Sequence, residues 1–466
     1  MRWKSCANGS SDNKVQAIVD KDAIDLPLYL HFESCKTAFI HVNVFISTAS
    51  IPVKLRPLMS VYYDMFFDTP IMMDGVRLEH EEVVTQIEKD TISTGISTGS
   101  YVDMPEGIRI KLQVEPEKYE TAIKWLRTLL WDSIFDKKRI GITVGRMRSN
   151  IPDEKRQGKY MVTSVKNMIE LAPESMGRAS DTLVKSKYLK RIEALLKEDP
   201  EEVIRQFEEF RQAFVKLDNM RMLVIADLEK LKNPVSTWKL FSEGKPFSGT
   251  LSPIDKRWER LSPAGQKPGG NANIVSMPTI DNTYSVHTCS GPTTLQDPQV
   301  PALMLALAYL GATEGPLWNA ARGSGLAYGV YIQRNQDAGQ RSFDVYRSPD
   351  AYKAFAAVRK VLQGYADGTT EFDDNALEGA ISGVILRFVD HEPNMTGAGV
   401  ASFIRQVVHG IPKDYNKEML RKVKMVTKDD IRKVLKEDVL RLFDPKSSNV
   451  VVVTAPVKAD VSAPGN

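Results

Sequence analysis

An internal repeat is the feature that most constrains what this chain can fold into. Residues 108–130 combine a run of alternating apolar and polar side chains, a proline, and an apolar stripe at helical spacing. Residues 342–362 contain the same strand, proline and helix pattern in the same order. The landmarks that repeat 233 positions apart are Pro116 and Tyr119 in the first copy and Pro349 and Tyr352 in the second. A repeat of this size predicts a duplicated domain rather than one continuous core.

A stretch rich in proline and glycine separates the two copies. Residues 244–270 contain four prolines, which prevent long helices and strands, and such a composition is typical of a linker. Each copy begins with a strand-like run and ends with an apolar strand. We therefore expect an α+β fold that is a tandem duplication of a mixed-sheet domain, with helices packed mainly on one face. The predicted divisions are an N-terminal extension (1–30), a first α+β domain (31–235), a linker (236–272), a second α+β domain (273–456) and a tail (457–466).

Composition and charge exclude several classes of protein. The 466 residues include 62 Lys and Arg against 59 Asp and Glu, and a net charge of +3 over this length indicates no nucleic-acid partner. No run approaches ~18 uninterrupted apolar residues, so no membrane span is expected. Cys6, Cys35 and Cys289 are too scattered for a disulfide framework or a cysteine-rich zinc site, which favours free thiols in a reducing compartment.

The histidines give no sign of a metal site. No two of the six have the i, i+4 spacing that places two imidazoles on one helix face around a zinc ion. The glutamates beside His80 are typical of the first turn of a helix, where the macrodipole favours acids. His41 lies in an apolar run and is interpreted as a core histidine. The sequence thus predicts no metal-ligating residue in this chain.

Residues 317–329 (LWNAARGSGLAYG) carry the most informative motif. A helical segment leads to Arg322, a glycine-containing turn follows, and Tyr328 lies six positions further on, within Ala-Tyr-Gly. This segment resembles a signature in the C-terminal half of pitrilysin/insulinase-type zinc metallopeptidases, and most closely that of the presequence proteases. The resemblance extends from about residue 38 to residue 456, as the third and fourth of four homologous domains, and it agrees with the duplication.

The resemblance implies that this chain is one half of an enzyme. The family's H-x-x-E-H zinc motif and its distant glutamate lie on the first domain, and nothing in this sequence matches them. By resemblance, the chain is the C-terminal half that encloses unfolded peptide substrates, which the complete hydrolase degrades. Zinc would be bound by an N-terminal half, in the same longer chain or on a separate subunit, and this chain alone would bind no cofactor and be inactive. The family occurs in mitochondria and cytosol, which implies an intracellular location in the cytoplasm or the mitochondrial matrix.

The same resemblance assigns roles to Arg322 and Tyr328. A tyrosine hydroxyl keeps its proton at neutral pH and can donate a hydrogen bond to the scissile carbonyl as oxyanion charge develops. Tyr328 is therefore the predicted catalytic residue, and it also contacts the substrate. Arg322 offers five donors in a fixed fork and is the second predicted substrate-binding residue. Taken without the resemblance, the residues also allow Arg322 to cap a helix C-terminus and Tyr328 to be a packed strand aromatic.

Two alternatives remain open. Relatives with the same duplicated domains serve as noncatalytic subunits, and a processing-peptidase-like or core-protein-like scaffold would keep Arg322 and Tyr328 only as remnants. The retained pair favours the peptidase interpretation, because a scaffold has no need for it. We also expect the chain to be a piece of a single longer enzyme.

Overall fold

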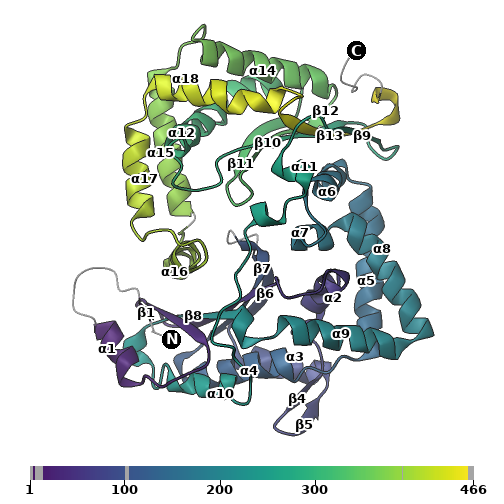
Figure 1. Cartoon of the computed structure of the whole chain (residues 1–466), viewed down its shortest axis with the longest axis vertical. Coiled ribbons are helices and arrows are strands. Elements are labelled where there is room, and N and C mark those ends of the chain that lie inside the picture. Colours follow the sequence, from purple (N-terminus) through teal and green to yellow (C-terminus); the bar gives the residue numbers. More distant parts are fainter. Residues whose placement is uncertain (1–3, 6–13, 100–103, 391, 460–466) are drawn as a thin grey trace. The chain divides into compact units, whose positions relative to one another are not determined.

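The computed structural model of the chain describes residues 4–5, 14–99, 104–390 and 392–459 (Figure 1). It divides into two compact units, each built from segments that are distant in the sequence. The first unit comprises residues 1–149, 184–255 and 392–410, and the second comprises residues 150–183, 256–391 and 411–466. Most of the predicted tail and part of the predicted N-terminal extension lie outside the described residues.

The first unit is built on a six-stranded mixed sheet. The strand β2 is parallel to β8, and the pairs β8–β3, β3–β7 and β7–β6 are antiparallel. The strands, in their spatial order, are β1 (Lys4–Ser5), β2 (Tyr29–Ser34), β8 (Met220–Ala226), β3 (Ile40–Ser47), β7 (Met104–Val114) and β6 (Ser93–Gly99). All seven residues of β8 are buried, Arg221 included, and the apolar run at 222–226 is typical of a central strand.

The second unit repeats this topology in a five-stranded sheet. Again a parallel pair, β9 with β13, is followed by the antiparallel pairs β13–β10, β10–β12 and β12–β11. In spatial order from the other edge, the strands are β11 (Gly329–Asn335), β12 (Gln340–Ser348), β10 (Thr283–Ser290), β13 (Ser448–Thr454) and β9 (Ala272–Ser276). The expected α+β duplication with mixed sheets is therefore confirmed.

Helices of the first unit pack on both faces of its sheet. Helix α4 (Tyr119–Trp131) contacts β3 and β7 with its apolar stripe, which includes the buried Ile123 and Leu126. The remaining helices that lie wholly or mainly in this unit are α1 (Lys14–Lys21), α2 (Leu58–Met65), α3 (His80–Asp90), α5 (Lys137–Lys155), α8 (Thr182–Glu198), α9 (Pro200–Phe214), α10 (Lys239–Ser242) and α16 (Met395–Phe403). A small hairpin joins β4 (Ile71–Met73) to β5 (Val76–Leu78).

Helix α16 comes from late in the sequence, yet it completes the core of the first unit. Phe403 is fully buried, and its ring stacks on that of Phe45 with centroids 4.9 Å apart. Val400 and Ile404 join the same cluster, which includes Leu223 of β8. The division predicted from the sequence did not place residues 392–410 in the first unit, because a helical apolar stripe does not identify the sheet that it covers.

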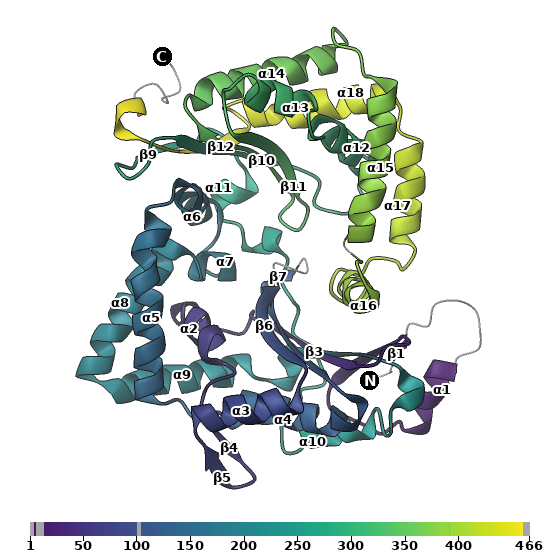
Figure 2. The same cartoon turned by 180° about the vertical axis from the view of Figure 1, so that it is seen from behind.

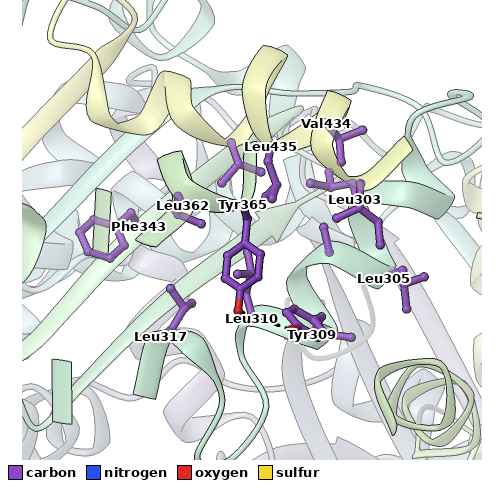
Figure 3. Close-up of a cluster of buried hydrophobic side chains, with 14 of the residues drawn as sticks. Leu303, Leu305, Tyr309, Leu310, Leu317, Phe343, Leu362, Tyr365, Val434 and Leu435 are labelled. Atoms are coloured by element: carbon purple, nitrogen blue, oxygen red, sulfur yellow. Dashed lines mark hydrogen bonds between the residues drawn. The ribbon is translucent and has the colours of Figure 1, made fainter. Parts of the chain in front are cut away.

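In the second unit most helices cover one face of the sheet, and α6 covers part of the other (Figures 1 and 2). The covering helices are α12 (Val300–Leu310), α13 (Pro316–Trp318), α14 (Ala351–Asp367), α15 (Asp374–Asp390), α17 (Tyr415–Lys424) and α18 (Lys428–Glu437). Their buried side chains, including Leu303, Leu310 and Leu435, form the cluster shown in Figure 3. On the opposite face, α6 (Gly158–Glu170) packs Val162 against Tyr284 and Val286. The short helices α7 (Met176–Ala179) and α11 (Pro263–Gln266) complete this unit.

The histidine expected in the core is only partly buried. His41 lies on β3 at intermediate exposure, and burial lowers its pKa. His287 on β10 is a buried histidine in the second unit, with its ring stacked on Phe355 and the ring centroids 4.8 Å apart.

None of the helices in the described part of the chain is both long and apolar enough to span a bilayer.

Candidate functional site

The turn that carries Arg322 is anchored at its base by small buried side chains. Helix α13 continues into a π-helical turn, Asn319–Gly323, a distortion that is often found at functional sites. The carbonyl oxygen of Ala321 accepts hydrogen bonds from the backbone N–H groups of Leu326 (2.8 Å) and Ala327 (3.2 Å). Ala321 and Ala327 are buried in the core of the second unit. The base of the turn is therefore fixed, whereas the residues at its tip, Arg322–Gly325, are exposed to solvent.

Two further features set the path of the turn. Gly325 has a φ of +74°, a conformation that glycine adopts without steric cost. Its N–H donates to the carbonyl oxygen of Arg322 at 3.0 Å. The Ser348 hydroxyl at the end of β12 donates to the carbonyl oxygen of Leu326 at 2.6 Å. These bonds fasten the turn to the sheet immediately before Tyr328.

The structure brings the two predicted site residues together. The Arg322 guanidinium carbon lies 4.6 Å from the centre of the Tyr328 ring, a cation–π contact worth roughly 0.5–1 kcal/mol at an exposed position. Tyr328 is 54% exposed and directly precedes β11, so its side chain is not packed as a strand aromatic would be. Both side chains are available to a ligand, and the contact limits the conformations that each can adopt.

Three residues that the sequence analysis did not identify extend this pair. The Tyr346 ring meets the Tyr328 ring edge to face, with centroids 5.9 Å apart, and meets the Tyr284 ring in the same way at 5.5 Å. The Arg347 guanidinium carbon lies 5.4 Å from the centre of the Tyr346 ring. We call Arg322, Tyr328, Tyr346, Arg347 and Tyr284 the arginine–tyrosine cluster. Tyr284 lies on β10 and Tyr346 and Arg347 lie on β12, two strands that are far apart in the sequence and adjacent in the sheet. The sequence alone therefore gave no reason to group these three residues with Arg322 and Tyr328.

The arginine–tyrosine cluster is positively charged without internal compensation. Among the residues that the structure describes, no carboxylate forms an ion pair with Arg322 or Arg347. A side-chain hydrogen bond with Tyr284 raises the pKa of Arg347, so its charge is retained at any physiological pH. The arrangement can bind an anion or a carbonyl oxygen, and the exposed Tyr328 hydroxyl can add a neutral donor.

Among the described residues, no group of side chains that could hold zinc is found. In the described ranges of the chain, no three His, Cys, Asp or Glu side chains gather closely enough to hold a metal ion. The two thiols within these ranges, Cys35 and Cys289, are unpaired, and burial raises the pKa of each.

Residues 277–456 match the family model of the PreP C-terminal domain. Both Arg322 and Tyr328 lie inside this PreP C-terminal domain match, as does the whole arginine–tyrosine cluster. The predicted resemblance to the C-terminal half of a presequence-protease-like protein is thereby confirmed.

Relatives in eukaryotes extend the similarity over the whole chain. An uncharacterized protein of Schizosaccharomyces pombe is 29% identical over 458 residues, which are 95% of this chain and 44% of that protein. An uncharacterized protein of Saccharomyces cerevisiae is 26% identical over 97% of this chain and 45% of its own length. The chain thus spans about half the length of the curated relatives that it matches.

Solved structures share the fold at low sequence identity. The peptidase M16 inactive domain of Pseudomonas fluorescens superposes with a TM-score of 0.67 at 14% identity, covering 92% of this chain and 96% of that one. A protease from Helicobacter pylori gives a TM-score of 0.64 at 13% identity over 91% of this chain and 96% of its own. Together with the PreP C-terminal domain match, this indicates a C-terminal half with the fold of peptidase M16 domains.

Proposed function

We propose that this chain is the substrate-facing C-terminal half of a presequence-protease-like zinc metallopeptidase that degrades unfolded peptides. The zinc would be held by an N-terminal half, in the same longer chain or on a separate subunit. The match to the PreP C-terminal domain supports this proposal, as does the length of the relatives, which leaves room for a second half. Alone, the chain is expected to bind peptides without cutting them.

Within the proposed enzyme, Tyr328 acts on the carbonyl group that is attacked. As negative charge develops on the carbonyl oxygen, the Tyr328 hydroxyl donates a hydrogen bond to it, and this bond is stronger in the transition state than in the ground state. Arg322 holds a neighbouring carbonyl or carboxylate of the peptide with its guanidinium fork. The contact of Arg322 with the Tyr328 ring orients both groups before the substrate arrives.

One observation carries this proposal. Arg322 and Tyr328 are exposed on a turn whose base is buried and hydrogen-bonded, so the fold presents the two side chains rather than packing them. An exposed arginine stacked on an exposed tyrosine contributes little to stability, and its cost in side-chain entropy is not repaid by burial. A role in binding accounts for the arrangement better than a role in folding does.

The test is the steady-state kinetics of the assembled enzyme with a fluorogenic unfolded peptide. Tyr328→Phe removes only the hydroxyl, and we expect kcat to fall by roughly 10²–10³ while KM changes little. Arg322→Met should mainly raise KM. The matched control is Tyr352→Phe. Tyr352 is 58% exposed on α14, and its ring takes no part in the ring contacts of the arginine–tyrosine cluster in the described structure.

Two results would count against the proposal. An unchanged kcat in Tyr328→Phe would remove Tyr328 from the mechanism. An assembled protein that binds its partner half but cuts no peptide would favour the scaffold alternative, in which the cluster has no catalytic role.

A further inference from the structure

A β-bulge shapes the arginine–tyrosine cluster. Thr283 pairs with Ser348 and Ser285 pairs with Val345, so two residues of β12 lie opposite the single residue Tyr284 of β10. Those two residues are Tyr346 and Arg347. A bulge bends its strand and redirects the side chains that it contains, and bulges are frequent beside functional sites.

The backbone at this bulge is unfavourable for the residue that occupies it. Arg347 has a φ of +52°, in the left-handed region that glycine adopts without steric cost and other residues rarely occupy. The Arg347 carbonyl oxygen accepts a hydrogen bond from the N–H of Tyr328 at 3.0 Å. This bond joins two backbone groups and does not depend on the side chain at position 347. Glycine would satisfy the same geometry without strain. A binding role for the arginine side chain would account for a strained residue at this position.

The bulge places the Arg347 charge in the same cluster as the Arg322 charge. Each guanidinium rests on a tyrosine ring, Arg322 on Tyr328 and Arg347 on Tyr346, and these two rings touch. No carboxylate of the described chain forms an ion pair with either guanidinium. An anionic group within reach of both would accept charge-assisted hydrogen bonds from two arginines.

The nearby acid on the sheet does not supply that group. Asp344 lies two residues before Tyr346 on β12, but it accepts a hydrogen bond from the Ser342 hydroxyl at 3.0 Å. Burial raises the pKa of Asp344, and the charge of Lys166 on α6 acts against that rise. Asp344 is thus partly buried and already accepts a hydrogen bond from a neighbouring side chain.

We propose that Arg347, held by the bulge, forms with Arg322 a binding site for a peptide carboxylate. This inference rests on the proposed function, which makes the ligand a peptide and so limits its anionic groups to side-chain carboxylates and the C-terminal carboxylate. The planar guanidinium matches a carboxylate with two parallel hydrogen bonds, and the tyrosine rings restrict it to a few orientations. Peptides that carry a carboxylate within reach of the cluster are therefore preferred.

The experiment measures binding of labelled unfolded peptides to the 466-residue chain by fluorescence anisotropy. Four versions of one peptide differ only in charge: a free or amidated C-terminus, combined with glutamate or glutamine at one internal position. We expect at least one carboxylate to tighten binding by roughly tenfold, and the arm that shows it identifies the source. Arg347→Met should abolish that preference, and Arg347→Lys should retain part of it.

Two further variants separate binding from folding. Arg347→Gly relieves the backbone conformation, so the variant should keep its melting temperature while losing the carboxylate preference. The control, Arg359→Met, removes the same charge from an exposed position on α14 and should bind all four peptides like the parent chain.

Each outcome decides between the two proposals. A carboxylate preference that survives in Arg347→Met would overturn the inference, as would equal binding of all four peptides by the parent chain. Both of those results leave the proposed function standing, because peptide still binds. If no version of the peptide binds, the proposed function fails together with the inference.

Discussion

The buried His287 gives a quantitative prediction about stability and pH. Its ring lies between Phe355 (4.8 Å) and Phe343 (5.6 Å), and Nδ1 has no hydrogen-bond partner within the described part of the chain. Burial lowers the pKa of His287 from 6.5 to about 4. Because the imidazolium form is penalised in this apolar site, the folded protein resists protonation that the unfolded chain accepts readily.

The sign and size of the effect follow from that difference in pKa. Between pH 6.5 and about pH 4 the unfolded chain binds a proton at His287 that the folded chain does not, so stability falls as the pH falls through this window. Linkage at about 1.4 kcal/mol per pKa unit gives a loss of about 1.4 kcal/mol at about pH 5.5 and about 2.5 kcal/mol at about pH 4.5. Above about pH 7.5 both states are deprotonated at His287, and the histidine contributes almost no pH dependence.

His287→Phe tests this reasoning, since phenylalanine keeps an aromatic ring against Phe355 but cannot be protonated. The free energy of unfolding of the second unit is measured by urea denaturation at several pH values, in the parent chain and in the variant. The difference in unfolding free energy between variant and parent should be about 2.5 kcal/mol larger at about pH 4.5 than at about pH 7.5, in favour of the variant. The control, Leu386→Ala, changes an exposed side chain of α15 that cannot be protonated and should run parallel to the parent. Curves that stay parallel for His287→Phe would refute the argument.

Three further substitutions test which contacts stabilise the core of each unit. Phe403→Ala removes a ring stacked on Phe45 and should lower the unfolding free energy of the first unit by about 3–5 kcal/mol in urea denaturation, whereas a loss under ~1 kcal/mol would exclude α16 from that core. Arg341 and Asp438 form a buried ion pair. Loss of solvation lowers the pKa of Arg341 and raises that of Asp438, so burial disfavours both charged forms more than their mutual attraction favours them. Arg341→Met should therefore cost about 3–5 kcal/mol in the same assay, and adding Asp438→Leu should recover most of it; a double variant no more stable than the single one would contradict this account.

Much of the fold could be predicted from the sequence because its strands are short, apolar and bounded by turns. The alternation at 108–114 and the apolar runs at 222–226 and 450–454 all correspond to observed strands, β7, β8 and β13. The proline-rich stretch at 244–270 contains only one short 3₁₀ turn, Arg257–Arg260, and helix α11 among its described elements. These features depend on local composition, which a single sequence displays directly.

Other features of the fold depend on which distant segments pack or pair with each other, and a single sequence does not show these contacts. Residues 150–183 and 392–410 are largely helical, but each segment packs in the unit that does not contain its sequence neighbours. The bulge at Tyr346 and Arg347 arises from pairing with Tyr284, so no alternation within residues 342–346 could reveal it. Arg322 and Tyr328 were found because their motif is contiguous, whereas the rest of the cluster is not.

The place of α16 in the first unit has a consequence for the order in which the chain can fold during synthesis. The ribosome adds roughly 5–20 residues per second from the N-terminus. The sheet of the first unit is complete once β8 has emerged, yet Phe45 and Leu223 stay uncovered until Val400 and Phe403 are made. Over that interval of seconds to tens of seconds, one apolar face of a finished sheet is exposed, and a nascent chain in this state is a substrate for chaperones.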